Sequence, residues 1–544
     1  MPTITYDKLD LLNLIGRKMT DQELEEVINS IKPEVVKITH DQITLEHYQD
    51  RPDMYGIEGL ARAIKLYTGR EKPRKFTEKS SRIDIKVGSV PLRPLIAAAV
   101  IKNVKLTSGF IESLMNIQEV LHETIGRKRK KVAIGIHDLD KIFPPINYEA
   151  VLPSTKMVPL GSTKEMSLME VLKENDKGRK YGALISQSSK WPVYSDAKGV
   201  FSFPPIINSD RTKVTPQTKN LLAELTGIDM HLLNQTLNIL ATGFSQRGGE
   251  IESVRILGKK IEVTPDLSEQ SMEINLDELN DWIGLKMQPN QVSSLLEKMG
   301  YSSKDRGKKI EVSVPCYRID ILHQVDVFED VAIAHGFNNF IPKIPNLSTT
   351  GGIDKLEKIS SKIRQLMVGF GFLEVVLPVM SNQEEQFAKT KVKGMMVEIE
   401  NPVSEEYTGL RVSLLPGLFR LLSKNRHVEY PQNIFEVGDI VVPDNDQETM
   451  SRTERKISGV FCHSKASFSE IKSLVESLMK NFGVNYQIEQ TEEMPFIAGR
   501  GAAIYSGEMK LGIFGEIHPQ VLENFGLEMP VASFEIDAEL ISMI

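Results

Sequence analysis

Cysteine is scarce in this chain, and long apolar runs are missing. Cys316 and Cys462 are the only cysteines, which excludes a disulfide framework and a cysteine-based zinc site and fits a reducing cytoplasm. No stretch approaches the ~18 apolar residues that a membrane span needs. The first residues also lack the basic start and apolar core of a secretory signal. We therefore expect a cytoplasmic protein that has no membrane partner.

A large excess of charge is also lacking, since the formal net charge is −7 at pH 7. This value argues against indiscriminate nucleic-acid binding, although a local basic surface is still compatible with it. A chain of 544 residues is too long for one hydrophobic core, and domains of roughly 100–200 residues predict three to five of them. We therefore expect a modular protein.

Breaks in the residue pattern divide the chain into four expected domains. An N-terminal α/β domain covers 1–75 and ends in a lysine-rich, proline-containing stretch typical of a linker. A mixed domain of strands and helices follows at 76–270, then a small helical module at 271–348. The last domain, 351–544, begins with a long helix and continues through several strands. The predicted fold class is multidomain α+β.

Four carboxylates within eleven residues form the most informative cluster in the sequence. The first follows a strand that Pro315 ends, because proline cannot donate to a ladder, and the other three share one face of the next helix. Carboxylates this close repel one another unless a cation or basic partners lie between them, and an all-oxygen set favours Mg²⁺ or Ca²⁺ over zinc. A solvated acidic helix start is the alternative, since acids favour the positive end of a helix dipole. The candidate metal ligands are Asp320, Asp326, Glu329 and Asp330.

A run of basic residues from Arg127 to Lys131 precedes an apolar strand pattern at 132–136. Such a run could contact phosphates. A solvated flank before a buried strand is the commoner case, however, and we rest no function on this run at the level of sequence.

Several motifs occur in the same order as in one known family, over essentially the whole chain. They are Asp50-Arg-Pro-Asp53, Glu58-Gly-Leu-Ala-Arg62, Ala133-Ile-Gly-Ile-His-Asp-Leu-Asp140, Phe203-Pro-Pro-Ile-Ile-Asn208, Val314-Pro-Cys-Tyr-Arg-Ile-Asp320, Asn401-Pro-Val-Ser404, Leu410-Arg-Val-Ser-Leu-Leu-Pro-Gly417 and Phe435-Glu-Val-Gly438. With them the chain resembles the beta subunits of phenylalanyl-tRNA synthetases of the archaeal and eukaryotic type, a class II aminoacyl-tRNA synthetase family.

The resemblance implies a complex of two alpha and two beta chains that attaches Phe to tRNA(Phe) with ATP. Aminoacylation would belong to the alpha chain, and the last domain here would be a catalytic-like class II domain, an antiparallel sheet with helices. It offers acids at 531–540 where such a site needs an arginine to neutralise phosphoryl charge. We therefore expect Arg411 and Glu436 to be structural or interface residues.

The resemblance also makes the acidic cluster a magnesium-binding module with a structural role. Asp50 stands where the family often has asparagine, and Asp330 where it often has glutamate, and both keep an oxygen ligand. The oligonucleotide-binding insertion and the C-terminal RNA-recognition-like domain of the bacterial form have no counterpart in this sequence. This difference puts direct anticodon contact by this chain in doubt.

The second domain resembles the editing domain of the family. A pocket for Phe rejects a substrate with one added hydroxyl only ~10²-fold, and a second, hydrolytic site that recognises the phenol can supply the rest. We predict that Glu224 accepts this hydroxyl, while Thr226 and Asn208 orient the ester or its water. His137 would position tRNA or water, although a structural cap at the strand end is an equal alternative. Gln118 and Arg129 are weaker candidates.

Two other classes of function were weighed against an editing beta subunit. A non-catalytic scaffold for tRNA binding and assembly would need neither Glu224 nor His137. A free-standing Mg²⁺-dependent hydrolase would need its metal beside a substrate pocket, whereas residues 320–330 fall in a compact module without nearby catalytic Lys or Ser pairs. The sequence therefore favours a subunit that acts with an alpha chain and tRNA(Phe) and that hydrolyses mischarged Tyr-tRNA(Phe).

Overall fold

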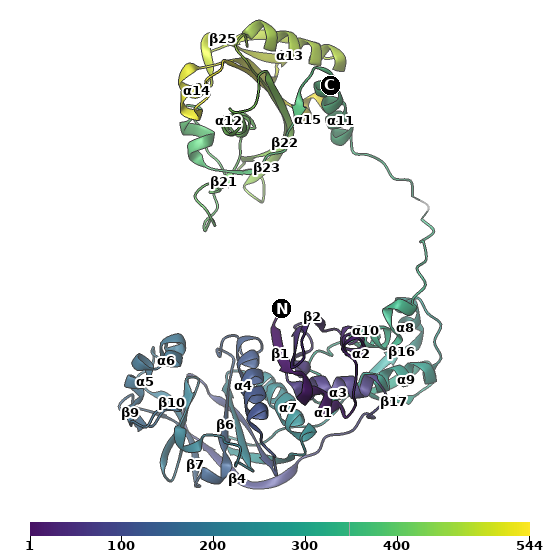
Figure 1. Cartoon of the computed structure of the whole chain (residues 1–544), viewed down its shortest axis with the longest axis vertical. Coiled ribbons are helices and arrows are strands. Elements are labelled where there is room, and N and C mark those ends of the chain that lie inside the picture. The colour runs from purple at the N-terminus through teal and green to yellow at the C-terminus, as the bar shows by residue number, and fades with distance from the viewer. Residues whose placement is uncertain (348, 544) are drawn as a thin grey trace. The chain divides into compact units, whose positions relative to one another are not determined.

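The chain is a multidomain α+β protein that folds into two compact units, Met1–Ile344 and Pro345–Ile544 (Figure 1). The structure is a computed structural model that describes residues 1–347 and 349–543. No helix in these described ranges is long and apolar enough to cross a bilayer. The first three predicted domains pack together within the first unit, so their individual boundaries stay a prediction.

The N-terminal part of the first unit is an antiparallel sheet with helices. Its strand order is β1–β3–β2, with β1 at Thr3–Asp7, β2 at Glu34–Ile38 and β3 at Gln42–Glu46. Local signals set the helix ends: α1 (Lys8–Ile15) ends at Gly16 with φ of 71°, and Thr20 with Glu23 forms the capping box of α2 (Asp21–Asn29). The buried helix α3 (Ile57–Tyr67) packs against α1 and against α7 (Met230–Gln246) of the second domain.

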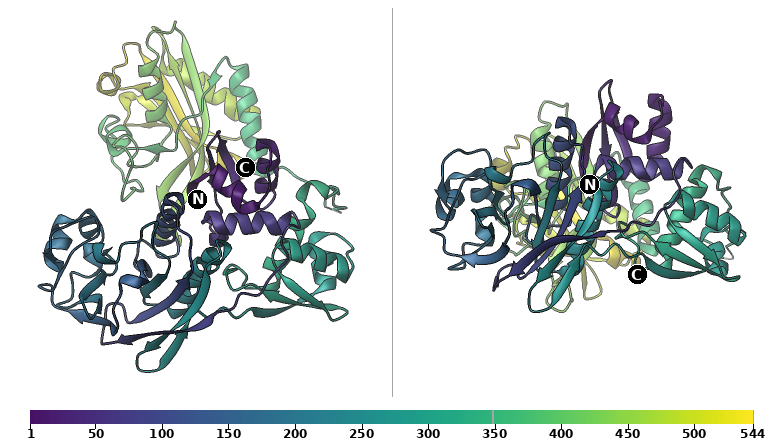
Figure 2. Two further views of the ribbon diagram at one scale, coloured as in Figure 1. Left: turned by 60° about the horizontal axis from the view of Figure 1, so that its bottom comes forward. Right: turned by 90° about the horizontal axis from the view of Figure 1, so that it is seen from below.

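The second domain is built on one mixed sheet whose two ends meet. Its strand order is β12–β11–β10–β7–β4–β14–β5–β13–β6, and β15 (Ile261–Thr264) pairs with β14. The side-chain amide of Asn208 in β12 donates to the carbonyl of Ile136 in β6 at 3.3 Å, so the sheet curves back on itself. Figure 2 shows this part of the chain from two further directions. The ordered strands are β4 (Lys79–Val87), β5 (Leu95–Lys102), β6 (Val132–Asp138), β7 (Ile146–Val151), β10 (Trp191–Asp196), β11 (Gly199–Phe203), β12 (Ile207–Asn208), β13 (Leu221–Gly227) and β14 (Glu250–Leu257).

The two faces of this curved sheet bury different cores, because side chains alternate along each strand. Leu221, Ala223 and Leu225 of β13 face a core that includes α4 (Ser108–Glu123) and α7. Leu222 faces the other core, which we call the inner face and which contains Tyr148 and Tyr194. Strand alternation therefore turns residue 224 toward the inner face.

The third domain is a mixed module and not the helical module that the sequence predicted. Strands β16 (Gln270–Asn275), β18 (Lys309–Val314) and β17 (Ser302–Asp305) form an antiparallel sheet beside α8 (Leu276–Ile283), α9 (Pro289–Lys298) and α10 (Gln324–His335). The strand that Pro315 ends and the helix that follows it are confirmed, and α10 ends at Gly336. The sequence analysis did not predict β16 and β17, whose residues are mostly exposed and polar. Both are strands because they pair with β18, since their residues have little intrinsic preference for a strand.

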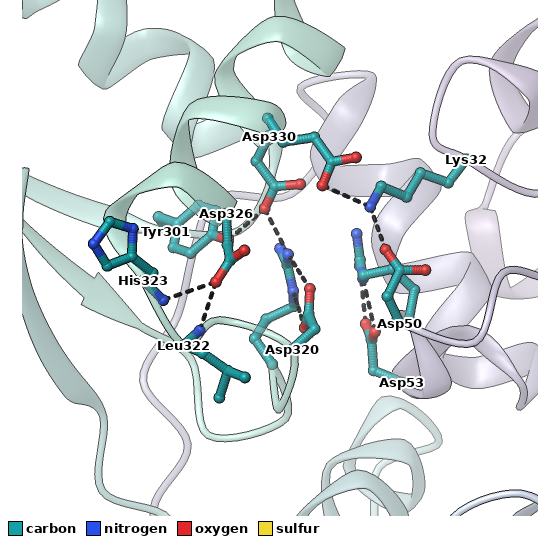
Figure 3. Close-up of polar contacts among 12 residues, drawn as sticks. Lys32, Asp50, Asp53, Tyr301, Asp320, Leu322, His323, Asp326 and Asp330 are labelled. Atoms are coloured by element: carbon teal, nitrogen blue, oxygen red, sulfur yellow. Dashed lines mark hydrogen bonds and ion pairs between the residues drawn. The ribbon is translucent and has the colours of Figure 1, made fainter. Parts of the chain in front are cut away.

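Two of the four clustered carboxylates, Asp320 and Asp330 (Figure 3), pair with a buried arginine. The Arg318 guanidinium donates to both carboxylate oxygens of Asp320, at 2.9 and 2.7 Å, and to Asp330 at 2.5 Å. The hydroxyl of Tyr301 donates to the same oxygen of Asp330. Burial alone would raise the pKa of Asp320, but the charge of Arg318 outweighs it and lowers that pKa.

One further ion pair joins this domain to the N-terminal part. Lys32 pairs with Asp50 of its own domain and, at 2.9 Å, with Glu329 of α10. Beside them Arg51 donates to both oxygens of Asp53, at 2.8 and 3.0 Å, and both side chains are buried. Basic side chains thus lie between the carboxylates of the two domains.

The second unit is a sheet covered by helices on both faces. Its strand order is β19–β22–β23–β27–β26–β25–β24, antiparallel except for β19 on β22. Helices α11 (Lys355–Gly369) and α13 (Phe468–Phe482) share one core with the sheet, and α12 (Leu415–Lys424) and α14 (Pro519–Phe525) share the other. The strands are β19 (Leu373–Glu374), β22 (Gln432–Pro443), β23 (Ser451–Cys462), β24 (Gln487–Thr491), β25 (Phe496–Ser506), β26 (Met509–Ile517) and β27 (Val531–Asp537).

Arg411 and Glu436 form a buried ion pair in this unit, at 2.8 Å. Arg411 also donates to the carbonyls of Asp439 at 2.9 Å and Leu377 at 3.3 Å. These contacts hold the side chain within the fold, which is the structural role that the sequence predicted.

We expect Arg318→Met to lower the free energy of unfolding of the first unit by about 3–5 kcal/mol, because it leaves two buried carboxylates without countercharge. Urea unfolding of the full chain, followed by tryptophan fluorescence, measures this change, since Trp191 and Trp282 are the only tryptophans and both lie in that unit.

Arg306→Met is the matched control. Arg306 pairs with Glu311 at 2.9 Å in the same domain, but its side chain is 59% exposed, so the expected loss is below ~1 kcal/mol. Equal losses in the two variants would contradict the role of Arg318 as a buried countercharge.

Candidate active site

A pocket of about 370 Å³ lies beside strand β6 in the second domain. Its walls come from α4, from the 204–208 segment after β11, and from the segment around Thr212. The lining is mainly apolar, which together with a few polar groups is typical of a site for a small organic group. The polar lining residues include Gln118, Glu119, Arg129, Lys177, Ser202, Asn208, Thr212, Lys213 and Glu224.

Glu224 is the buried carboxylate of this pocket. Its Oε1 accepts a hydrogen bond from Oγ of Ser202 at 2.8 Å and lies 3.6 Å from Nε2 of His137. Gly135 stands opposite Glu224 in the register of β6 and β13, and a Cβ there would collide with Oε1. Among the described residues, Oε2 of Glu224 has no hydrogen-bond partner. A donor on a bound molecule can satisfy it, since a buried carboxylate oxygen without a partner is costly.

His137 is held behind this carboxylate. Its Nδ1 is 2.8 Å from the hydroxyl of Thr212, and its ring meets Phe201 edge-on with centroids 5.1 Å apart. The ring is buried and reaches the pocket through Glu224 and Thr212, which both line it. The structure therefore brings His137 and Glu224 together, as the sequence analysis expected of one site, but does not place the ring in the pocket lining.

Asn208 and Thr226 have different surroundings. Asn208 lines the pocket, and its Oδ1 accepts from Oγ of Ser202 at 3.4 Å. The buried hydroxyl of Thr226 accepts from Nε of Arg93 at 3.0 Å, and its carbonyl accepts from the same guanidinium at 2.5 Å. These bonds make Thr226 an anchor for Arg93, which differs from the predicted role in orienting an ester.

Gln118 and Arg129 both line the pocket and both brace its wall. Gln118 donates to the carbonyl of Ile134 at 2.6 Å. Arg129 donates to the carbonyls of Pro205 and Ile206 at 2.9 and 3.0 Å. The two weaker candidates of the sequence thus line the pocket and bond to backbone carbonyls, and a catalytic role for them stays a prediction.

Four further residues of the site were not found from the sequence. Ser202 and Gly135 fix the position of the Glu224 carboxylate. Burial lowers the pKa of Arg93, and the nearby charge of Glu224 acts in the opposite direction. Burial, the charge of Glu224 and a hydrogen-bonding contact with that carboxylate raise the pKa of Tyr194 well above its usual value, so the phenol of Tyr194 lies within reach of Glu224. Alternation along the strands was the one available signal, since Ser202 falls between the buried Phe201 and Phe203.

The four predicted metal ligands do not converge on one point. Asp320 and Asp330 bind Arg318, Glu329 binds Lys32, and Oδ2 of Asp326 accepts the backbone N–H groups of Leu322 and His323, at 2.8 Å each, at the start of α10. Within the described ranges, no group of three or more His, Cys, Asp or Glu is arranged to hold a metal ion. The arrangement does not fit a shared Mg²⁺ site, and basic partners supply the countercharge instead.

Known proteins match this chain along most of its length. Residues 93–246 match the B3/4 domain, 272–337 the tRNA synthetase B5 domain, and 341–538 the phenylalanyl tRNA synthetase beta chain CLM domain. The phenylalanine-tRNA ligase beta subunit of Archaeoglobus fulgidus is 39% identical over 550 residues, covering 99% of this chain and 98% of that one. The same subunit of Methanocaldococcus jannaschii is 40% identical over 549 residues, covering 99% of this chain and 100% of that one.

A solved structure agrees with these sequence matches. The N-terminal fragment of the phenylalanyl-tRNA synthetase beta-subunit from Pyrococcus horikoshii superimposes with a TM-score of 0.60 and 36% identity, covering 61% of this chain and 99% of that chain. Identity at this level over nearly the whole of two relatives shows the family. The chain belongs to the beta subunits of phenylalanine-tRNA ligase.

Proposed function

We propose that this chain works in the cytoplasm as half of a ligase, in a complex of two alpha and two beta chains that attaches Phe to tRNA(Phe) with ATP. The printed name of its relatives, beta subunit, supports a partner chain. The bonds of Arg411 inside the second unit support it as well, because a side chain held by Glu436 and by two carbonyls is not available to bind a phosphate.

We propose further that the pocket of the second domain hydrolyses Tyr-tRNA(Phe). The observation that carries this proposal is the buried carboxylate of Glu224, which has one oxygen without a hydrogen-bond partner among the described residues in a pocket whose lining is mainly apolar. A Tyr side chain can donate its phenol to this oxygen. A Phe side chain cannot, and it would leave the carboxylate buried and unsatisfied.

The expected selectivity follows from this difference. A site built to hydrogen-bond a hydroxyl rejects the analogue that lacks it by ~10⁴–10⁵-fold, whereas a hydrophobic pocket rejects an added hydroxyl only ~10²-fold. An editing pocket with Glu224 would therefore accept Tyr and reject Phe. A synthetic pocket for Phe rejects Tyr only weakly, so the editing pocket would supply the missing selectivity. Asn208 lines the pocket and is placed to orient the ester or its water.

A non-catalytic scaffold is the second candidate. Such a protein gains nothing from a carboxylate in an apolar interior, because burial of a charge costs free energy and an apolar side chain of similar volume would stabilise the fold. The close fit of Ser202 and Gly135 around Glu224 also favours editing over a scaffold.

We expect the purified chain alone to form no aminoacyl-adenylate, because the adenylating site would belong to the alpha chain. Phe-dependent exchange between ATP and pyrophosphate measures this activity, and it should appear once the alpha chain is added. Exchange by the isolated chain would contradict the division of labour.

We expect Glu224→Gln and Glu224→Ala to slow hydrolysis of Tyr-tRNA(Phe) by the assembled enzyme about ten- to a hundred-fold, because loss of a hydrogen bond to a charged group costs ~1.5–3 kcal/mol. Deacylation of preformed Tyr-tRNA(Phe) measures the effect. Phe-tRNA synthesis should stay nearly intact, since it would occupy another chain.

Glu149→Gln is the control for this substitution. Glu149 lies on β7 of the same sheet and accepts from Ser195 at 2.7 Å, so its replacement should leave hydrolysis unchanged. Equal losses of synthesis and hydrolysis in the Glu224 variants would indicate a folding defect. Unchanged hydrolysis in both would leave the second domain as a scaffold.

The predicted Mg²⁺ site has its own test. Arg318 and Lys32 already form ion pairs with three of the four carboxylates, so we expect the thermal melting temperature of the full chain to be the same in EDTA and in millimolar Mg²⁺. A fall in EDTA that Mg²⁺ reverses, and that an Asp326→Asn variant abolishes, would support the metal site in place of the arginine.

A further inference from the structure

The basic run 127–131 contributes one residue to the pocket wall. Arg129 is buried and lines the pocket, while Arg127, Lys128, Lys130 and Lys131 are exposed. The run therefore has one side chain in the wall and four exposed side chains that adjoin it in the chain. A simple solvated flank before a strand does not explain this division.

The backbone of the run has an unusual conformation that produces this division. Arg127, Lys128 and Arg129 have φ values of 48°, 55° and 64°, which is the left-handed region that residues with a Cβ avoid. Three such residues in succession persist only where the surroundings fix them, and such strain clusters at functional sites. The N–H of Arg129 donates to the carbonyl of His122 at 3.1 Å, and that of Lys131 to Gly126 at 2.9 Å.

The side chain of Arg129 anchors the turn. Its guanidinium stacks 4.4 Å from the ring centre of Tyr181, next to its bonds to the 205–206 carbonyls. Gly126 is needed at the start of the turn, because a Cβ there would come within 2.6 Å of the carbonyl oxygen of Val132 and 2.7 Å of that of His122. The fold thus holds the neighbouring cations at the pocket.

The nearby acids are already neutralised. Glu119 pairs with Arg129 at 2.7 Å and with Lys177 at 3.1 Å. Burial alone would raise the pKa of Glu119, but the His122 ring and these two cations outweigh it and lower that pKa. Glu123 pairs with Lys180 at 3.3 Å. The exposed cations of the run at 127–131 therefore outnumber the nearby acids.

We propose that this rim, formed by Arg127, Lys128, Lys130 and Lys131, binds the backbone phosphates at the single-stranded 3′ end of an aminoacylated RNA. The inference rests on the proposed editing function. A pocket of about 370 Å³ holds the aminoacyl group but not the nucleotides to which it is esterified, so their phosphates lie outside it. Four cations on a rigid turn match that position, and phosphate contacts orient a nucleic acid without reading its sequence.

The test is the triple variant Lys128→Gln/Lys130→Gln/Lys131→Gln in the assembled enzyme, which keeps Arg129 and the pocket wall. Its control is Lys86→Gln/Lys259→Gln/Lys260→Gln, three exposed lysines of the same domain outside the pocket lining. Single-turnover hydrolysis of Tyr-tRNA(Phe) over a range of concentrations separates binding from chemistry. The same enzymes are also given tyrosyl-adenosine, an ester that carries no phosphate.

We expect the rim variant to raise the half-saturating concentration of Tyr-tRNA(Phe) at least tenfold and to change the maximal rate less than twofold. The slope of log affinity against log salt should fall by about 2, since each lost single-strand phosphate contact contributes ~0.7. Hydrolysis of tyrosyl-adenosine should be equal in the rim variant, the control and the unchanged enzyme.

Each other outcome has a distinct meaning. An unchanged half-saturating concentration and salt slope in the rim variant, with normal editing by the unchanged enzyme, would contradict phosphate binding by the rim. Equal effects of the rim and control variants would show that only the total charge of the domain matters, and would contradict it as well. Hydrolysis of neither ester by the unchanged enzyme would overturn the editing function, and direct binding of an acceptor-end RNA to the two variants would then still decide the rim.

Discussion

Burial of one carboxylate inside a sheet that closes on itself is the constraint on which the pocket depends. Closure brings β11 opposite β13, so that Ser202 reaches Glu224 at 2.8 Å. The missing Cβ of Gly135 leaves room for that carboxylate in the neighbouring strand. A buried charge with an unsatisfied oxygen raises the free energy of the empty pocket, and a donor from a ligand removes this cost. The fold therefore favours an occupant with a hydroxyl.

The same need for countercharge is met differently in the third domain. Arg318 is buried with Asp320 and Asp330. Its planar guanidinium donates to the carboxylate oxygens that a metal ion would otherwise bind. Lys32 adds a cation from the N-terminal part. The acids of α10 therefore obtain part of their countercharge from the interface between the two domains. One carboxylate, Asp326, has a separate role as the cap of that helix.

The two units of the chain divide the work of a ligase subunit. The first holds an apolar pocket with a basic rim, a combination that suits a charged polymer carrying an apolar group. The second has a sheet covered on both faces by helices, and its buried Arg411 is committed to Glu436 and to backbone carbonyls. We proposed hydrolysis of the aminoacyl ester for the first unit, and the commitment of Arg411 to the fold supports the proposal that the second unit acts in assembly.

The sequence by itself determined the features that depend on a few neighbouring residues. Gly16 ends α1, Thr20 with Glu23 begins α2, and Pro315 ends β18, because caps and proline act within one turn or one strand. The order of its motifs was enough to indicate the family. Glu224, Asn208 and Gln118, which the sequence singled out, line one pocket in the structure, and their roles in editing stay a proposal.

Only the tertiary structure decided which distant side chains meet. The contact of Ser202 with Glu224 spans 22 positions and that of Arg93 with Thr226 spans 133, so both depend on strand order and on closure of the sheet. Spacing predicted that the acids of α10 need a countercharge, either a metal ion or basic partners, and we predicted four metal ligands. The structure instead pairs Asp320 and Asp330 with the buried Arg318, because burial and pairing between elements follow from packing and not from local pattern.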